Sequence, residues 1–156
     1  MRFEDFHAGQ IITGGPHRVG EREILEFARA WDPQWFHADV SAAALGPFAG
    51  LIASGWHTCS VAMRLIVSAA LAGSEAYASP GVEDIRWPSP VRSGDELRLR
   101  AQVLEVRRSK SRAKIGVLRW RWQLHNQDGV EVLELTATSL FRLSETDRSI
   151  PERGQC

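Results

Sequence analysis

Residues 51–72 read LIASGWHTCSVAMRLIVSAALA, and this stretch decides the fold. Six apolar residues recur through it at helical spacing: Trp56, Cys59, Met63, Ile66, Val67 and Ala70. The pattern predicts a long, buried helix over about residues 56–72. Small residues at positions 53, 54, 55 and 60 would let another part of the backbone approach the start of this helix closely.

The segment before the long helix predicts a second, amphipathic helix over residues 21–31. Its apolar residues fall at positions 24, 25, 27, 28 and 31, and Pro33 ends it, so Asp32 is expected at its C-terminus. Asp39 is expected to cap a short helical turn over 40–45. Residues 32–39 between them are too rich in turn and aromatic residues for the middle of a helix. Residues 11–13 and 17–19 predict two short extended pieces around a turn at 14–16.

After the long helix the hydrophobic period changes to two, which indicates strands. Tyr77 to Pro80 is interpreted as a linker, followed by strands over 82–87, 97–103, 114–124 and 130–143. A shift of parity in the third of these predicts a bulge near residues 116–118, and Asn126 to Gly129 predicts a hairpin turn. The apolar face of such an antiparallel sheet must be covered, and only the helix over 56–72 is long enough. We therefore predict an α+β fold, a sheet wrapped around a central helix in the hot-dog architecture.

Composition predicts a single domain over residues 1–156, with 144–156 as a polar C-terminal tail. Lysine plus arginine and aspartate plus glutamate are 19 each, and this zero net charge argues against nucleic-acid binding and mildly favours an oligomer. The two cysteines, Cys59 and Cys156, form no disulfide framework or metal motif. The sequence has neither a signal peptide pattern nor an uninterrupted membrane span, so we expect no membrane association and a cytoplasmic location.

Asp32 and His37 form the candidate catalytic pair. Taken singly, an aspartate before a proline is more often a turn former, and a histidine among aromatics is more often packed or exposed. Together they place a carboxylate and an imidazole in one tight segment, which suits the activation of a water molecule. His17 and His125 show no ligand spacing, so no metal is expected. His57 is interpreted as a helix-face histidine with a local partner, and Cys59 as a small core residue.

Three stretches carry a resemblance to a known family: residues 32–39 (DPQWFHAD), 48–57 (FAGLIASGWH) and 81–95 (GVEDIRWPSPVRSGD). They resemble the MaoC-like dehydratases, which include the (R)-specific enoyl-CoA hydratases, and the likeness runs from about Phe6 to Leu143. The resemblance implies that Asp32 and His37 hold a water molecule and that Gly55, at the start of the central helix, binds the thioester oxygen. It also implies a homodimer as the smallest assembly. Many members have proline where this chain has Trp35, and we expect this bulk to reshape the pocket.

The resemblance implies a hydro-lyase that adds water to, or removes it from, an acyl-CoA thioester, with no cofactor. One assignment consistent with the pair has Asp32 accept the water proton while His37 orients the water and helps return a proton to carbon, and the sequence leaves open which residue carries which proton. The Gly55 amide would stabilise negative charge on the thioester oxygen. Two alternatives stay open: a thioesterase on the same fold, and a non-catalytic acyl-CoA binding module with a pocket narrowed by Trp35. The basic run over residues 107–112 is interpreted as a solvated loop, with attraction for coenzyme A phosphates as the alternative.

Overall fold

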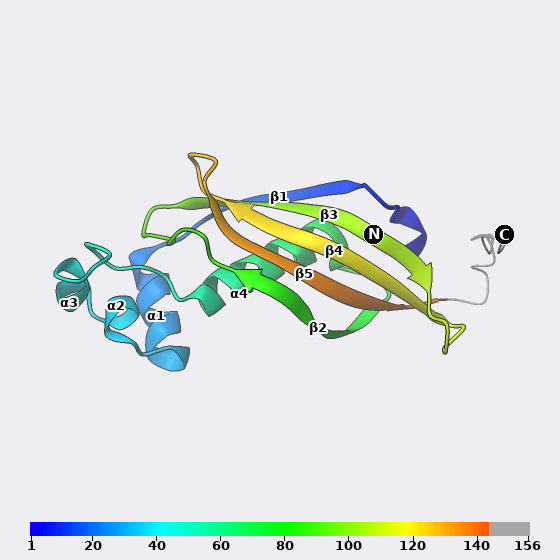
Figure 1. Cartoon of the computed structure of the whole chain (residues 1–156), viewed down its shortest axis with the longest axis horizontal. Coiled ribbons are helices and arrows are strands. Elements are labelled where there is room, and N and C mark those ends of the chain that lie inside the picture. Colours follow the sequence, from blue (N-terminus) through cyan, green and yellow to red (C-terminus); the bar gives the residue numbers. More distant parts are fainter. Residues whose placement is uncertain (144–156) are drawn as a thin grey trace.

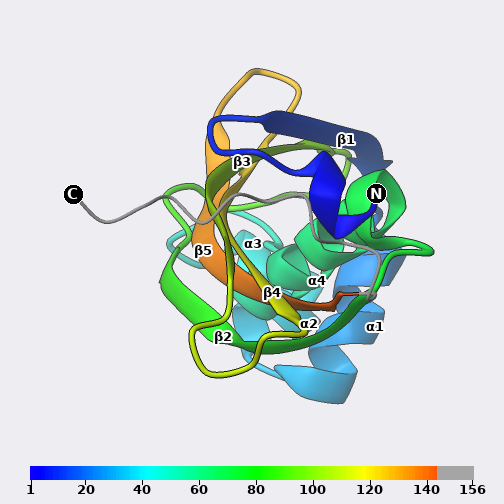
Figure 2. The same cartoon turned by 90° about the vertical axis from the view of Figure 1, so that its right-hand side faces the viewer.

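A five-stranded antiparallel sheet curls around helix α4 (Gly55–Ile66), as Figures 1 and 2 show. The computed structural model describes residues 1–143. The strands are β1 (Ile11–Arg18), β2 (Ala76–Arg86), β3 (Glu96–Arg108), β4 (Ile115–His125) and β5 (Glu131–Arg142). Their order across the sheet is β1-β3-β4-β5-β2. The predicted α+β hot-dog fold is therefore confirmed.

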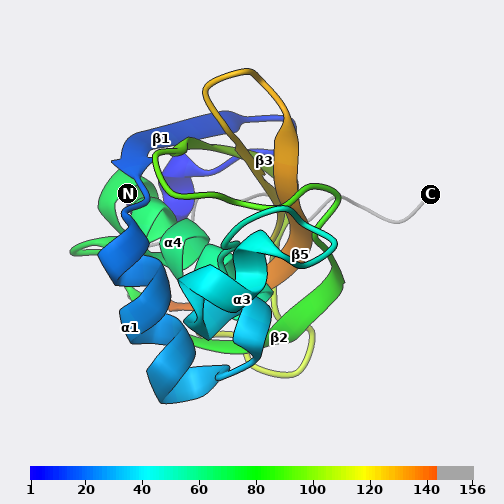
Figure 3. The same ribbon diagram turned by 90° about the vertical axis from the view of Figure 1, so that its left-hand side faces the viewer.

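The other helices gather at one end of the sheet, beside the start of α4 (Figures 1 and 3). They are α1 (Glu21–Trp31), α2 (Trp35–Ala38) and α3 (Val40–Ala44), while η1 (Phe3–Asp5) precedes β1 and a turn of π-helix, η2 (Val67–Leu71), extends α4. The predicted helix over 21–31 is confirmed, and Asp39 caps α3 by accepting the Ala42 N–H at 2.9 Å. The turn expected over 32–39 contains one full helical turn, α2, which carries His37.

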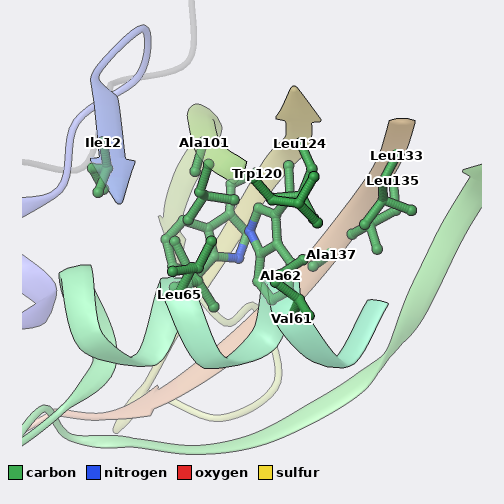
Figure 4. Packing of buried hydrophobic residues seen from close by; sticks show 14 of the residues in the cluster. Ile12, Val61, Ala62, Leu65, Ala101, Trp120, Leu124, Leu133, Leu135 and Ala137 are labelled. Atoms are coloured by element: carbon green, nitrogen blue, oxygen red, sulfur yellow. The ribbon is translucent and has the colours of Figure 1, made fainter. Parts of the chain in front are cut away.

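The core lies between α4 and the concave face of the sheet. Figure 4 shows Val61, Ala62 and Leu65 of α4 packed beneath Trp120 of β4, and the Trp120 side chain is completely buried. The expected buried face of the helix was partly wrong, since Trp56 and Met63 are exposed. The buried face consists of His57, Thr58, Val61, Ala62, Leu65 and Ile66. Two polar residues belong to it because each has a hydrogen-bond partner there.

Three strands, β1, β2 and β3, are longer than the sequence predicted. β1 runs through Gly14, Gly15 and Pro16, which form an irregularity within the strand and not a turn. Gly15 has φ +100°, and a Cβ there would lie 2.8 Å from the Leu97 carbonyl oxygen, so glycine allows β1 to stay paired with β3. β2 includes the presumed linker over 77–80; it pairs only with β5, and proline is tolerated in such an edge strand.

The strand irregularity predicted near residues 116–118 lies instead in β3. β4 pairs with β5 in unbroken register from Ile115 to Leu124, whereas the β3–β4 register shifts between Val103 and Glu105. The extra residue, Leu104, bends β3 around the core. Every even-numbered position of β4 from Gly116 to Leu124 is buried, so this face of the strand is unbroken. The apparent shift came from apolar residues on the opposite face, of which Val117 is buried as well.

The polar tail predicted over 144–156 lies outside the described residues, and the single-domain assignment stays a prediction. Within residues 1–143, no helix has both the length and the hydropathy needed to cross a membrane.

Candidate active site

A cavity of about 440 Å³ opens where α1 and α2 meet the start of α4. Asp32, His37 and Gly55, which lie on three different elements, all line it. Its other lining residues are Gln34, Phe48, Ile52, Ala53, Trp56, Thr58, Trp87, Pro88, Ser89, Pro90, Val91 and Val132. The structure therefore brings together the three residues predicted from the sequence, in a cavity of the size that small-molecule sites have.

Asp32 is the residue that ends α1, and its carboxylate is held by two hydrogen bonds. The Ser54 hydroxyl donates to Oδ2 at 2.7 Å, and the Gln34 side-chain amide donates to Oδ1 at 2.8 Å. The Ser54 hydrogen bond lowers the pKa of Asp32, against the effect of burial, with further lowering by Gln34 and by the charge of His37. Asp32 is therefore an anion at neutral pH, and a weaker base than an ordinary aspartate.

The orientation of His37 is fixed by the backbone. Its Nδ1 lies 2.7 Å from the carbonyl oxygen of Ile52, and because a carbonyl can only accept, Nδ1 carries the proton. In the neutral imidazole, Nε2 is then an acceptor, and it lies 3.5 Å from Oδ2 of Asp32. That separation is too long for a strong direct hydrogen bond. The site therefore presents two acceptors side by side, Asp32 Oδ2 and His37 Nε2. One water molecule can bridge them by donating one O–H group to each.

Gly55 is the first residue of α4, so its N–H has no acceptor within the helix. The next N–H, of Trp56, donates to the Ser54 hydroxyl at 3.2 Å, which leaves the Gly55 amide as the donor nearest the cavity. The helix dipole favours negative charge at this position. A thioester oxygen could accept a hydrogen bond here without displacing one that the protein makes.

The reason for glycine at position 55 differs from the one expected. A Cβ at this position would lie 2.5 Å from the indole ring of Trp87, and the Trp87 N–H donates to the Gly55 carbonyl at 2.9 Å. Glycine is thus required first by the packing of Trp87, which forms one wall of the cavity. The close approach expected at this position is therefore made by a side chain, and not by another part of the backbone.

The Gly55→Ala variant is expected to lose roughly 1–3 kcal/mol of folding free energy, because the methyl group would displace the Trp87 ring and its hydrogen bond. Urea unfolding followed by circular dichroism would measure this loss. Gly20→Ser is the matched control, since a Cβ at Gly20 meets nothing within 4 Å, its φ is −93°, and serine is a preferred residue at this N-cap of α1. Equal stability of the two variants would show that Trp87 does not depend on Gly55.

Ser54, Gln34 and Trp87 are site residues that sequence reasoning missed. Ser54 was interpreted only as a small residue that permits close packing, yet it is buried, caps α4 and binds Asp32. Its position directly before the helix start was a usable signal, because serine is a preferred N-cap residue. Nothing in the sequence pattern indicates that Trp87, far along the chain, folds over Gly55.

Trp35, expected to reshape the pocket, does not line the cavity. Its ring packs on Gly46, where a Cβ would lie 2.6 Å from it. The expectation was wrong because α2 turns Trp35 and His37 toward different sides. Cys59 is partly buried against the core, and burial raises the pKa of its thiol, so it is not activated as a nucleophile.

His57 is buried, and its partner is not local: Nε2 lies 2.9 Å from Oε1 of Glu23 on α1. Among the described residues there is no cluster of three or more histidine, cysteine, aspartate or glutamate side chains arranged to hold a metal ion. The basic run over 107–112 lies at the β3–β4 turn, at the end of the sheet opposite α1, α2 and α3 (Figure 1). Within one chain it is therefore remote from the cavity.

The fold and the cavity define a class of protein, a hot-dog domain with a carboxylate and an imidazole at the start of its central helix. The chain matches the model of the MaoC like domain over residues 5–119, and it belongs to this family. The family includes 3-hydroxyacyl-thioester dehydratases and (R)-hydratases.

Three similar proteins illustrate the relationship. Over 134 residues the chain is 30% identical to the uncharacterized protein YdeM of Bacillus subtilis. The aligned region covers 86% of this chain and 94% of that protein. Over 90 residues it is 32% identical to 3-hydroxyacyl-thioester dehydratase Z of Mycobacterium tuberculosis. The aligned region covers 56% of this chain and 60% of that protein. The solved MaoC-like dehydratase from Rhodospirillum rubrum is 38% identical, with a TM-score of 0.83 over 90% of this chain and 96% of that chain.

Proposed function

We propose that the protein adds water to the double bond of a 2-enoyl-CoA thioester, or removes it from the corresponding 3-hydroxyacyl thioester. The observation that carries the proposal is the pair of acceptors, Asp32 Oδ2 and His37 Nε2, 3.5 Å apart and facing one cavity. One acceptor is an anion and the other has its tautomer set by the Ile52 carbonyl. A water molecule that donates to both would have its oxygen lone pair free to attack a carbon.

The proton path follows from the two environments. Because the pKa of Asp32 is lowered, His37 Nε2 is the better base of the two. In the hydration direction, the water oxygen bonds to Cβ while its proton passes to Nε2, and the imidazolium then gives a proton to Cα. The net change is H on Cα and OH on Cβ. Asp32 holds the water and stabilises the transient imidazolium, so the proposal assigns to His37 the proton transfers that the sequence left open between the two residues.

The negative charge that develops during this step falls on the thioester oxygen. The Gly55 N–H at the start of α4 would stabilise this charge by donating a hydrogen bond to the oxygen. It has no intrahelical partner, and the helix dipole adds to its effect. Loss of one such donor typically costs about 10²–10³ in rate. With no metal or redox cofactor in the proposal, these three groups supply the whole of the chemistry.

The two alternatives have less support. A thioesterase would direct the same water molecule to the carbonyl carbon and not to Cβ, whereas the similar protein of Mycobacterium tuberculosis is a 3-hydroxyacyl-thioester dehydratase. The non-catalytic reading depended on Trp35 narrowing the pocket, and Trp35 does not line the cavity.

The experiment is to incubate the protein with crotonyl-CoA and longer 2-enoyl-CoAs while following both the enoyl absorbance and the release of free thiol. We expect the absorbance to fall without thiol release. Thiol release would establish the thioesterase instead, and no change in either signal with any chain length would overturn an enzymatic function on these substrates.

We further propose that the working form is a homodimer joined at the β2 edges. β2 pairs only with β5 and is exposed along almost its whole length. Three exposed apolar residues lie on α4 and at the start of η2: Trp56, Met63 and Val67. Long exposed edges of this kind normally find a partner. Light scattering at micromolar concentration should give twice the 17.4 kDa chain mass, and a monomer would contradict the proposal.

A further inference from the structure

A second cavity, of about 400 Å³, lies between α1 and α4 and contains a carboxylate bound by two imidazoles. Oε1 of Glu23 lies 3.0 Å from Nε2 of His17 and 2.9 Å from Nε2 of His57. An ionised carboxylate can only accept, so both histidines donate from Nε2. Burial raises the pKa of Glu23, but the hydrogen bonds from His57 and His17 outweigh it and the pKa is lowered. Glu23 is therefore an anion shared by β1 and α4.

The environment of His57 indicates that its hydrogen bond to Glu23 matters more than the packing of its ring. The ring is 4% exposed and stacks on Phe27 of α1, with ring centroids 4.9 Å apart and an interplanar angle of 11°. Its other nitrogen, Nδ1, is buried and has no hydrogen-bond partner in the described part of the chain. An unsatisfied buried nitrogen costs free energy that an apolar side chain of similar size would avoid. What the imidazole adds here is the hydrogen bond to Glu23.

The contacts of α1 explain what that bond could control. One face of α1 is fixed by Ile24 and Ala28, which are completely buried, and its last turn leads directly to Asp32. Asp32 in turn meets the N-cap of α4 through Ser54. The position of Asp32 therefore depends on how α1 lies on α4. His37 is anchored separately by the Ile52 carbonyl, and Gly55 belongs to α4 itself.

We propose that His17, Glu23 and His57 form a polar clamp that fixes α1 on β1 and α4 and thereby positions Asp32 against His37 and Gly55. The three are positioning residues, since none of them lines the active-site cavity. The clamp is the only group among the described residues in which one carboxylate joins β1, α1 and α4 at once. Its role in turnover rests on the proposed hydratase function, but its role in placing Asp32 does not.

The test compares Glu23→Gln with Glu26→Gln. Both residues lie on α1 and line the second cavity, but Glu26 pairs with Arg22 at 2.6 Å and contacts neither histidine. A glutamine at position 23 can still accept where Oε1 stands, but it lacks the negative charge and places an N–H group at the position of Oε2, which lies 3.2 Å from the donor Nε2 of His17. We expect Glu23→Gln to lower kcat by about tenfold or more with KM within about twofold, because small displacements of a catalytic group cost rate more than binding. Glu26→Gln should keep the wild-type kcat.

A second readout does not depend on turnover. In ¹⁵N-histidine NMR spectra, the His37 Nε2 resonance reports the nearby Asp32 carboxylate, and it should shift in Glu23→Gln but not in Glu26→Gln. His17→Asn is the variant to use if Glu23→Gln fails to fold. It removes one imidazole donor from a less buried position, and the His37 Nε2 resonance should shift in the same sense. A folded Glu23→Gln or His17→Asn with the kcat and the His37 resonance of Glu26→Gln would overturn the clamp. If the wild type hydrates no enoyl thioester, the function fails while the NMR comparison still decides the clamp.

Discussion

The His37→Asn variant is expected to hydrate an enoyl thioester roughly 10²–10⁴ times more slowly than the wild type, with little change in KM. Asparagine places an amide N–H near the position of Nδ1, so the 2.7 Å hydrogen bond to the Ile52 carbonyl can be kept. It provides no basic nitrogen where Nε2 stands. The variant therefore removes the proton acceptor while retaining the local anchor, which alanine would also remove.

The measurement is kcat and KM with the best enoyl-CoA substrate, together with the thermal unfolding temperature. His7→Gln is the control, because His7 is an exposed histidine that does not line the cavity. A His37→Asn protein with the unfolding temperature and kcat of the wild type would show that Nε2 takes no part in proton transfer. Asp32 would then have to be the base, despite its lowered pKa.

The position of the candidate pair, Asp32 and His37, could be predicted because it depends on local chemistry. Pro33 ends α1, so Asp32 has to leave the helix, and His37 follows within one short segment. The hot-dog architecture could be predicted because the hydrophobic period changes from helical to alternating at one place in the chain. Gly55 at the first position of α4 followed from the same pattern.

The contacts that refine the site could not be predicted, because they join residues far apart in the sequence. The Asp32–Ser54 bond spans 22 positions, the Gly55–Trp87 bond 32 and the Glu23–His57 bond 34. Hydrophobic periodicity also misassigned the buried face of α4, since it counts His57 and Thr58 as polar. Their burial depends on Glu23 and on the Ser54 carbonyl, and no local pattern reports such partners.

Substitutions of Asp32 and of Ser54 separate two effects, the loss of the negative charge and the loss of the hydrogen bond that holds it. Ser54 acts on the site by holding the carboxylate and by lowering its pKa, whereas Asp32 supplies the charge itself. Because the pKa of Asp32 lies below its ordinary value of 3.8, the ionised carboxylate stabilises the fold above about pH 4. That stabilisation is lost as the pH falls through the lowered pKa.

The Asp32→Asn variant is expected to lower kcat by about 10²–10³, since it removes the anion beside the imidazolium formed at His37. An asparagine oxygen can still accept from Ser54, so the fold is retained, and the contribution of Asp32 to acid unfolding disappears. Asp39→Asn is the matched control: Asp39 lies in the same segment but caps α3, a role that asparagine also fills. Asp39→Asn should therefore keep the wild-type kcat.

Ser54→Ala should act in a different way, because the charge stays but its strongest hydrogen bond is lost. The pKa of Asp32 then rises toward its ordinary value, and the acidic limb of the kcat/KM profile moves to higher pH, with a smaller loss of kcat at neutral pH than in Asp32→Asn. Profiles of both variants between about pH 2.5 and about pH 9 measure these two effects, because the range must extend below the ordinary Asp32 pKa of 3.8. If Ser54→Ala lowers the rate equally at every pH without moving the limb, the ionisation of Asp32 does not govern activity, and Ser54 matters only for the position of the carboxylate.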